Sequence, residues 1–214
     1  MSNDERMLRQ LLSETGALIT NTHVRLASGR HSDRYIEKTA LLRRADHCQI
    51  IADMIVRIFA SKSIEVVIGP AIGGVGLAAA VALRMGQLNS ASDKIEWGFA
   101  EPSRDSEGRL VFYELKRGFA QMVEDKRVLV VEDIVTSGLS SGLVVKAVRA
   151  NRGKVAGLAA IINRGRVTSA DVGHPGTFRP LMTIDLPSYE VSDCPMCQRG
   201  VPISPLFGHG KRSS

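Results

Sequence analysis

The chain has 214 residues, 44% of them hydrophobic, and 28 Lys and Arg against 22 Asp and Glu give a formal net charge of +6. This length and composition fit one α/β domain with small appendages, and no apolar run is long enough to cross a membrane. Because the cations are scattered and aromatic residues make up only 5% of the chain, we expect anionic small molecules rather than nucleic acid as partners.

The N-terminal region is predicted to form a helix followed by a short hairpin. Leucines at helical spacing indicate an amphipathic helix within residues 4–18. Residues 21–38 alternate between apolar and polar side chains around Ser28 and Gly29, which predicts a β-hairpin or a short pair of strands. His31 has no partner visible in the sequence, and we interpret it as a surface or hydrogen-bonded histidine rather than a catalytic base.

The middle of the chain alternates buried strands with amphipathic helices. This alternation is typical of α/β proteins in which helices cover both faces of a mostly parallel sheet. In chain order, we expect a helix at 50–59, a strand at 64–68, a helix at 77–85, strands at 94–100, 111–115 and 128–131, a helix from 141, and strands at 154–162 and 178–186.

A glycine-rich turn, residues 69–76, follows the first buried strand. Gly74 and Gly76 loosely match a dinucleotide-binding fingerprint, which is weak evidence when it stands alone. The alternative is a backbone cradle for pyrophosphate, because glycines let a charged ligand approach the main chain. We prefer the cradle, since a ribose-phosphate pattern follows downstream; its residues are Ala71, Ile72, Gly73 and Gly74.

Residues 127–142 are the most informative stretch of the sequence. Four apolar residues from Val128 predict a strand buried on both faces, and Glu132 and Asp133 stand where this strand is expected to end. The start of the next helix offers free backbone N–H groups, so residues 136–140 suit a phosphate monoester. Carboxylates would repel that phosphate, so we expect them to bind sugar hydroxyls and a divalent metal of the same ligand. The stretch therefore predicts a site for a phosphorylated ribose.

Arg164 follows the strand expected at 154–162. An arginine at the C-terminal end of a parallel strand lies where open α/β sheets bind their ligands. Its planar guanidinium suits a carboxylate or the edge of a pyrimidine dione, the alternative being an ordinary loop arginine.

The C-terminal tail contains one Cys-x-x-Cys pair, Cys194 and Cys197. Such a pair supports zinc or redox chemistry only with further ligands, and Cys48 and His209 are remote in sequence, so metal binding stays open. Three cysteines are too few for a disulfide scaffold, and the first residues lack the layout of a secretory signal. We therefore expect reduced thiols and a cytoplasmic protein.

Residues 128–140, Val-Leu-Val-Val-Glu-Asp-Ile-Val-Thr-Ser-Gly-Leu-Ser, resemble the phosphoribosyl-pyrophosphate signature of type I phosphoribosyltransferases. Residues 26–35, 69–74 and 163–164 are similar to the hood, the pyrophosphate loop and the orotate-binding arginine segment of orotate phosphoribosyltransferases. The resemblance implies a type I phosphoribosyltransferase fold: a mostly parallel central sheet, flanking helices and a small N-terminal hood. It also implies Mg²⁺-dependent transfer of phosphoribosyl from 5-phosphoribosyl 1-diphosphate (PRPP) to orotate in pyrimidine biosynthesis, by a homodimer.

The same resemblance implies a role for each candidate residue. Glu132 and Asp133 would be catalytic, with Mg²⁺ nearby on the substrate. The ribose and its 5′-phosphate would bind to Glu132, Asp133, Ile134, Val135, Thr136, Ser137, Gly138, Leu139 and Ser140. The pyrophosphate would bind to residues 71–74, and orotate to Ser28, Gly29, Thr136 and Arg164.

One segment departs from the family pattern. The polar stretch 101–108 is expected to be a flexible lid, but it lacks the Arg-Lys-x-x-Lys-x-His-Gly string of the best-known members. The missing positive charge would have to come from Arg104, Arg109, Lys116 and Arg117, or else these are solvated surface residues. The sequence leaves open which subunit this loop serves.

Two alternative functions remain at this point. One is a phosphoribosyltransferase for another base, and the other is a non-catalytic regulator that binds PRPP to sense it. For the chain as a whole we expect a single domain, with an N-terminal helix and hood over 1–40, an α/β core over 41–186 and a tail over 187–214.

Overall fold

The computed structural model describes residues 2–26, 28–88 and 94–208, so His209 lies outside the described residues. Its centre is a six-stranded sheet with the strand order β10-β9-β8-β5-β6-β7. Neighbouring strands from β10 to β6 are parallel, and only β7, at one edge, is antiparallel to its neighbour. The predicted mostly parallel sheet is confirmed. Its strands are β5 (Val66–Pro70), β6 (Glu96–Arg104), β7 (Leu110–Glu114), β8 (Arg127–Val135), β9 (Lys154–Asn163) and β10 (Phe178–Thr183).

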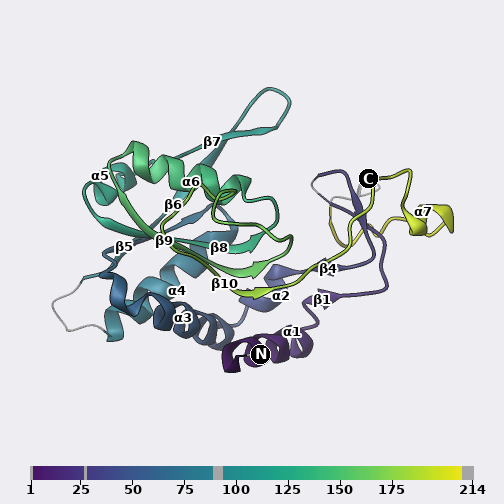
Figure 1. The fold of residues 1–214 in the computed structure, drawn as a ribbon, viewed down its shortest axis with the longest axis horizontal. Helices are drawn as coiled ribbons and strands as arrows, with labels where there is room; N and C mark the ends of the chain where they lie inside the picture. Colours follow the sequence, from purple (N-terminus) through teal and green to yellow (C-terminus); the bar gives the residue numbers. More distant parts are fainter. Residues whose placement is uncertain (1, 27, 89–93, 209–214) are drawn as a thin grey trace.

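Helices cover both faces of this sheet (Figure 1). Strand β8 shows why, because alternate residues of its apolar run supply two separate cores. Leu129 and Val131 pack with the cluster of α1 (Asn3–Glu14), α3 (Ala45–Phe59) and α4 (Gly73–Leu88). Val128 and Val130 pack with the cluster of α5 (Phe119–Val123) and α6 (Leu139–Ala150) on the opposite face. The unbroken apolar run therefore corresponds to a strand that is buried on both faces.

Several element boundaries differ from the predictions. Strand β8 continues to Val135, so Glu132 and Asp133 lie inside its C-terminal half rather than after it. Helix α6 begins at Leu139, two residues earlier than its apolar periodicity indicates. Helix α4 begins at Gly73, inside the glycine-rich turn.

The hood consists of two short strand pairs. Strands β2 (Val24–Arg25) and β3 (His31–Ser32) form the predicted hairpin around Ser28 and Gly29. Tyr35 and Ile36 do not extend this hairpin, because as β4 (Tyr35–Ile36) they pair with β1 (Leu18–Ile19). Helix α2 (Lys38–Leu42) leads back to the core, and the 3₁₀ turn η1 (Ala60–Lys62) precedes β5.

The tail lies beside the hood at one end of the molecule (Figure 1). His31 and Tyr189 form an isolated antiparallel bridge, with both backbone N–H···O distances at 2.8 Å. Within the described residues, a loop follows the short helix α7 (Pro195–Gln198). Among the described helices, none has both the length and the apolar character needed to span a bilayer.

Candidate active site

Three loops that follow strands β5, β8 and β9 meet at the edge of the sheet formed by the carboxyl ends of these strands. They meet because β8 is hydrogen-bonded to β5 on one side and to β9 on the other, all three running parallel. In parallel α/β sheets, ligands bind in the crevice outside the carboxyl ends of the strands. The loop at 71–74, the loop at 136–138 and Arg164 all lie at this edge.

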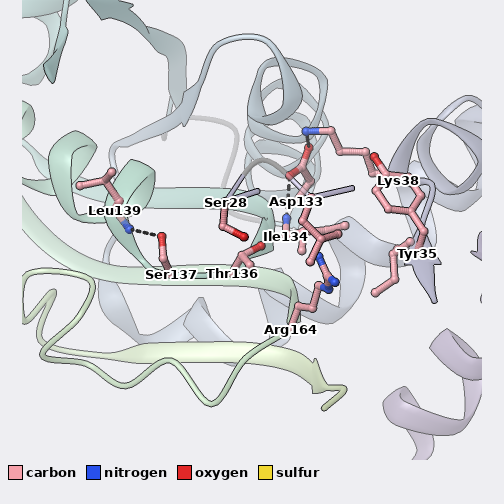
Figure 2. A pocket seen from close by; sticks show the side chains of 11 residues that line it. Ser28, Tyr35, Lys38, Asp133, Ile134, Thr136, Ser137, Leu139 and Arg164 are labelled. Carbon is pink, nitrogen blue, oxygen red and sulfur yellow. Dashed lines mark hydrogen bonds and ion pairs between the residues drawn. The ribbon is translucent and has the colours of Figure 1, made fainter. Parts of the chain in front are cut away.

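A cavity of about 430 Å³ lies between this edge and the hood. Figure 2 shows Ser28, Thr136 and Arg164 around it, although these residues come from segments far apart in the sequence. Seven predicted site residues thus share one cavity with other residues of the hood; its lining is Leu26, Ser28, Tyr35, Ile36, Lys38, Asp133, Ile134, Thr136, Ser137, Leu139 and Arg164.

A second hollow of about 330 Å³ lies on the other side of Asp133, next to the glycine-rich turn. Ile72 and Gly73 line it together with α2, and it shares Asp133 and Lys38 with the first cavity. A methyl group on Gly73 would overlap the Asp133 carboxylate and come within 2.7 Å of Lys38 Nζ. Glycine at this position therefore leaves room for the Lys38 and Asp133 side chains that the two hollows share.

Asp133 is buried at the junction of the two hollows, with 3% of its surface exposed. Its Oδ1 accepts a hydrogen bond from the backbone N–H of Ile134 at 2.6 Å. Lys38 Nζ forms an ion pair with Oδ2 at 2.8 Å. The angles of this contact do not meet those of a hydrogen bond, so Oδ2 has no hydrogen-bond partner among the described residues. Burial alone would lower the pKa of Lys38, but the Asp133 carboxylate raises it overall. The junction is thus a charged pair in which one buried carboxylate oxygen accepts no hydrogen bond from the described residues.

Glu132 points away from this junction. Consecutive strand residues face opposite sides of a sheet, and the Glu132 carboxylate accepts a hydrogen bond from Ser141 Oγ of α6 at 3.1 Å. It lines neither hollow. Burial, and then repulsion by Asp133, raises the pKa of Glu132 to about 8. The sequence pattern predicted the same role for both acids, but the structure gives them different surroundings.

This environment predicts a pH-dependent stability. Between the ordinary pKa of 4.5 and about 8, the folded protein keeps the Glu132 proton that the unfolded chain has lost. Unfolding then releases a proton, so the free energy of unfolding must fall as pH rises through this range. In Glu132→Gln we expect this fall to be smaller by about 1–3 kcal/mol between pH 5 and pH 8. Urea denaturation at several pH values measures it.

The exposed Glu96 provides the control for that experiment. Glu96→Gln removes a carboxyl group at the solvent-facing start of β6 and should reproduce the wild-type pH dependence. Parallel stability curves for Glu132→Gln and the wild type would show that the Glu132 proton is not retained on folding.

The loop before α6 presents backbone donors to the first cavity. Gly138 has φ 82°, in the left-handed region, and a Cβ there would lie 2.7 Å from the carbonyl oxygen of Asp171. No side chain caps the first turn of α6 from the N-cap position, and the Leu139 N–H makes only a 3.4 Å contact with Ser137 Oγ. The helix start is an anion-binding arrangement. Ser140 lies in this first turn but does not line the cavity.

Arg164 turns its side chain into the cavity below Ile134 (Figure 2). Its backbone N–H donates to the carbonyl of Val135 at 2.8 Å, which fixes the position of the residue at the end of β9. Burial lowers the pKa of its guanidinium, which remains charged at neutral pH. Within the described residues no acid pairs with this guanidinium, so its donors face the cavity.

The four candidate cations of the 101–117 segment lie away from both hollows. The segment is a β-hairpin projecting from the sheet rather than an irregular loop, since β6 continues to Arg104 (Figure 1). Its role as a lid remains a prediction. Asp105 holds its turn by accepting the N–H groups of Glu107 and Arg109. Each cation has a partner on the hairpin. Arg104 donates a hydrogen bond to the carbonyl of Gly108. The other three form ion pairs, Arg109 with Asp105, Lys116 with Glu114 and Arg117 with Glu101.

Two site residues were not predicted from the sequence. Lys38 lines both hollows, and Tyr35 lines the first cavity together with Arg164 (Figure 2). Both lie at the end of the hood, where nothing in the local pattern separates a cavity-lining residue from an exposed one. Only the position of the hood over the sheet edge identifies them.

Comparisons with known proteins agree with this geometry. Residues 38–176 match the phosphoribosyl transferase domain family. The chain is 35% identical over 202 residues to an orotate phosphoribosyltransferase from Pelotomaculum thermopropionicum, covering 94% of this chain and 95% of that protein. It is also 35% identical to one from Caldicellulosiruptor bescii, covering 91% and 92%.

A solved structure shares the fold. The orotate phosphoribosyltransferase of Mycobacterium tuberculosis H37Rv, in complex with 5-phospho-α-D-ribosyl 1-diphosphate, matches with a TM-score of 0.60 at 22% identity, covering 84% of this chain and 96% of that one. The signature at 128–140 lies within the matched domain, and the sequence relatives extend over hood and tail. The chain therefore belongs to the phosphoribosyltransferase family, among the orotate phosphoribosyltransferases.

Proposed function

We propose that the protein transfers the phosphoribosyl group of PRPP to orotate and forms orotidine 5′-monophosphate and diphosphate. The observation that carries this proposal is the pair of hollows joined at Asp133 and Lys38. A substrate with a phosphate at one end, a sugar in the middle and a diphosphate at the other end matches two connected hollows. The PRPP-bound enzyme of the same fold supports the choice of substrate.

PRPP is expected to cross the junction with its sugar beside Asp133. The 5′-phosphate would accept hydrogen bonds from Thr136, Ser137 and the free N–H groups at the start of α6. The diphosphate would lie against residues 71–74, with Lys38 close to its charge. Binding at both ends then orients the anomeric carbon between them.

Orotate is expected to bind under the hood, at Ser28, Gly29, Thr136 and Arg164. The Arg164 guanidinium offers two parallel donors to the orotate carboxylate. The pyrimidine nitrogen, already deprotonated, forms a bond to the anomeric carbon as the bond from that carbon to diphosphate oxygen breaks. Positive charge that develops on the ribose lies beside the Asp133 carboxylate, which stabilises it. No general base is required.

Mg²⁺ fits the donors at this junction. The Asp133 Oδ2 atom has no hydrogen-bond partner among the described residues, and Mg²⁺ prefers carboxylate oxygen together with substrate phosphates. Asp133 is the residue that would hold it, whereas the Glu132 carboxylate faces Ser141 on the other side of the sheet. When bound, the ion neutralises charge on the leaving diphosphate.

The hairpin β6–β7 supports a homodimer as part of the proposal. Its four cations lie outside the hollows of their own chain, and Val111 and Phe112 of β7 are 49% and 43% exposed. A second copy that buries these side chains would bring the cations toward a neighbouring site. A cytoplasmic location remains a prediction from the sequence.

A spectrophotometric assay with orotate, PRPP and Mg²⁺ tests the function. We expect orotate absorbance to fall only when all three are present, and a panel of purine and pyrimidine bases to give no comparable rate. Turnover with another base would overturn the choice of orotate. PRPP binding without turnover of any base would favour the sensing regulator.

A further inference from the structure

A cluster of four metal-ligating side chains lies outside the active site, where the tail meets the hood. His23 and His31 come from the two sides of the β2–β3 hairpin, and Cys194 and Cys197 come from the start of α7. His23 and His31 are each 3% exposed and Cys194 is fully buried, whereas Cys197 is partly exposed. We refer to these residues as the Cys₂His₂ cluster. Segments separated by more than 160 positions thus bring four potential ligands together.

The distances within the cluster are those between the corners of a small tetrahedron. His23 Nε2 lies 2.9 Å from His31 Nδ1, 3.5 Å from Cys194 Sγ and 3.7 Å from Cys197 Sγ. Cys197 Sγ lies 3.2 Å from His31 Nδ1, and all four atoms lie within 4.8 Å of one another. Tetrahedral Zn²⁺ bonds of roughly 2.0–2.3 Å separate their ligand atoms by about 3.3–3.8 Å. Small shifts therefore suffice to accommodate an ion.

The hydrogen bonding of His23 favours a metal ligand. Its Nδ1 lies 2.7 Å from the carbonyl oxygen of Val201, and because a carbonyl only accepts, Nδ1 carries the proton. The unprotonated Nε2 then points toward the two sulfur atoms and His31. A ligating histidine commonly donates its other N–H to a backbone carbonyl in this way, which fixes the ring and its tautomer.

We propose that the Cys₂His₂ cluster binds one Zn²⁺ ion, which joins the C-terminal tail to the hood. Two thiolates and two imidazoles in a tetrahedron are a ligand set typical of zinc. All four ligands come from the protein, so the site is closed and structural rather than catalytic. This proposal is independent of the transferase reaction.

The proposed zinc site would stabilise the hood, whose own strand pairing is short. The β2–β3 hairpin has only two paired positions, Val24 with Ser32 and Arg25 with His31, and so short a hairpin is unstable in water by itself. Ser28, at the tip of this hairpin, lines the candidate active site. An ion held by residues on both sides of the hairpin keeps this tip in place over the cavity.

The sequence pattern identified two of the four side chains of this cluster. It indicated the Cys-x-x-Cys pair, but Cys48 is not among the further ligands in the cluster, and His209 lies outside the described residues. Of the two interpretations of His31, a surface or a hydrogen-bonded histidine, the structure shows the second: its side chain is buried and lies 2.9 Å from His23 Nε2. The hairpin register, which no local pattern specifies, puts His31 beside His23.

Elemental analysis of the full chain, purified under reducing conditions after growth with zinc, tests the proposal. We expect about one Zn²⁺ per chain in the wild type and below about 0.1 in Cys194→Ser/Cys197→Ser. Cys48→Ser, which removes a thiol outside the cluster, should retain the full amount. Removal of the metal from the wild type by a chelator should lower Tm by more than about 5 °C, and added Zn²⁺ should restore it, a result that needs no variant to fold.

Three results would overturn the proposal. The first is a wild-type chain that stays free of zinc when Zn²⁺ is supplied. The second is equimolar zinc in the double variant, which would put the ion elsewhere. The third is a native Cys194–Cys197 disulfide, detected as a mass lower by two hydrogens that reduction restores, because a disulfide removes both thiolate ligands.

Discussion

Asp133→Asn is expected to reduce kcat about 10²–10³-fold, the largest effect of any single substitution considered. The asparagine keeps the shape of the side chain and the hydrogen bond from the Ile134 N–H, but it removes the charge at the junction of the two hollows. The free energy of unfolding should change by less than about 1 kcal/mol. Lys38 is 48% exposed and can be solvated without its partner, and Glu132 loses a repulsive neighbour.

Steady-state kinetics and urea denaturation of the same preparation separate these two effects. Asp46→Asn serves as the matched control, because Asp46 forms an exposed ion pair with Arg44 and lines neither hollow. It should leave kcat unchanged and lower the free energy of unfolding only slightly, because it removes an exposed ion pair and a charge at the start of α3. If Asp133→Asn retained activity within a few-fold of the wild type, the role of this carboxylate in the reaction would be disproved.

Arg164→Lys should raise the KM for orotate about 10–100-fold and change the KM for PRPP by less than about 3-fold. Lysine keeps the positive charge but replaces a planar pair of donors by a single ammonium group, which cannot form two parallel hydrogen bonds with a carboxylate. Arg164 is not among the residues expected to hold PRPP, and Thr136, Ser137 and the lining of the second hollow are unchanged, so PRPP binding should be largely preserved.

Arg166→Lys is the control for this experiment. Arg166 lies two residues further along the chain, is 83% exposed and pairs with Asp185 outside the cavity. Its substitution should leave both KM values unchanged. Equal increases in the two KM values for Arg164→Lys would indicate a general disturbance of the site and would contradict orotate recognition by this residue.

The sequence predicted the parts of the fold that depend on local pattern. The run from Val128 to Val131 predicts β8 because only a strand covered on both faces buries four consecutive β-branched or leucine side chains. The same run does not show that the strand continues to Val135. The different environments of Glu132 and Asp133 arise from that continuation, because residues inside a strand face opposite sides.

The segment at 101–108 shows how tertiary pairing overrides composition. Its polar residues and Pro102 favour a loop, yet residues 101–104 extend β6. Strand β5 is paired with β6 only as far as Ala100, so beyond that point β6 has a neighbour only in β7. A proline is tolerated in such an edge position because its missing N–H has no partner to lose.

Contacts between distant segments lie beyond what local sequence patterns specify. Lys38 meets Asp133 only after the hood has folded over the sheet, and His23 lies 171 positions from Cys194. The candidate site residues that the sequence did predict belong to short motifs whose side chains or backbone groups indicate a ligand by themselves, such as the acid pair and the loop before α6. The division into hood, core and tail remains a prediction.

A crystal structure of the protein with PRPP and Mg²⁺ tests the central claim most directly. We expect the ribose hydroxyls within about 3 Å of the Asp133 carboxylate, the 5′-phosphate on the donors at 136–140 and the diphosphate against residues 71–74. A sugar bound away from Asp133, or a PRPP molecule confined to one of the two hollows, would contradict the proposal that they form a single substrate site.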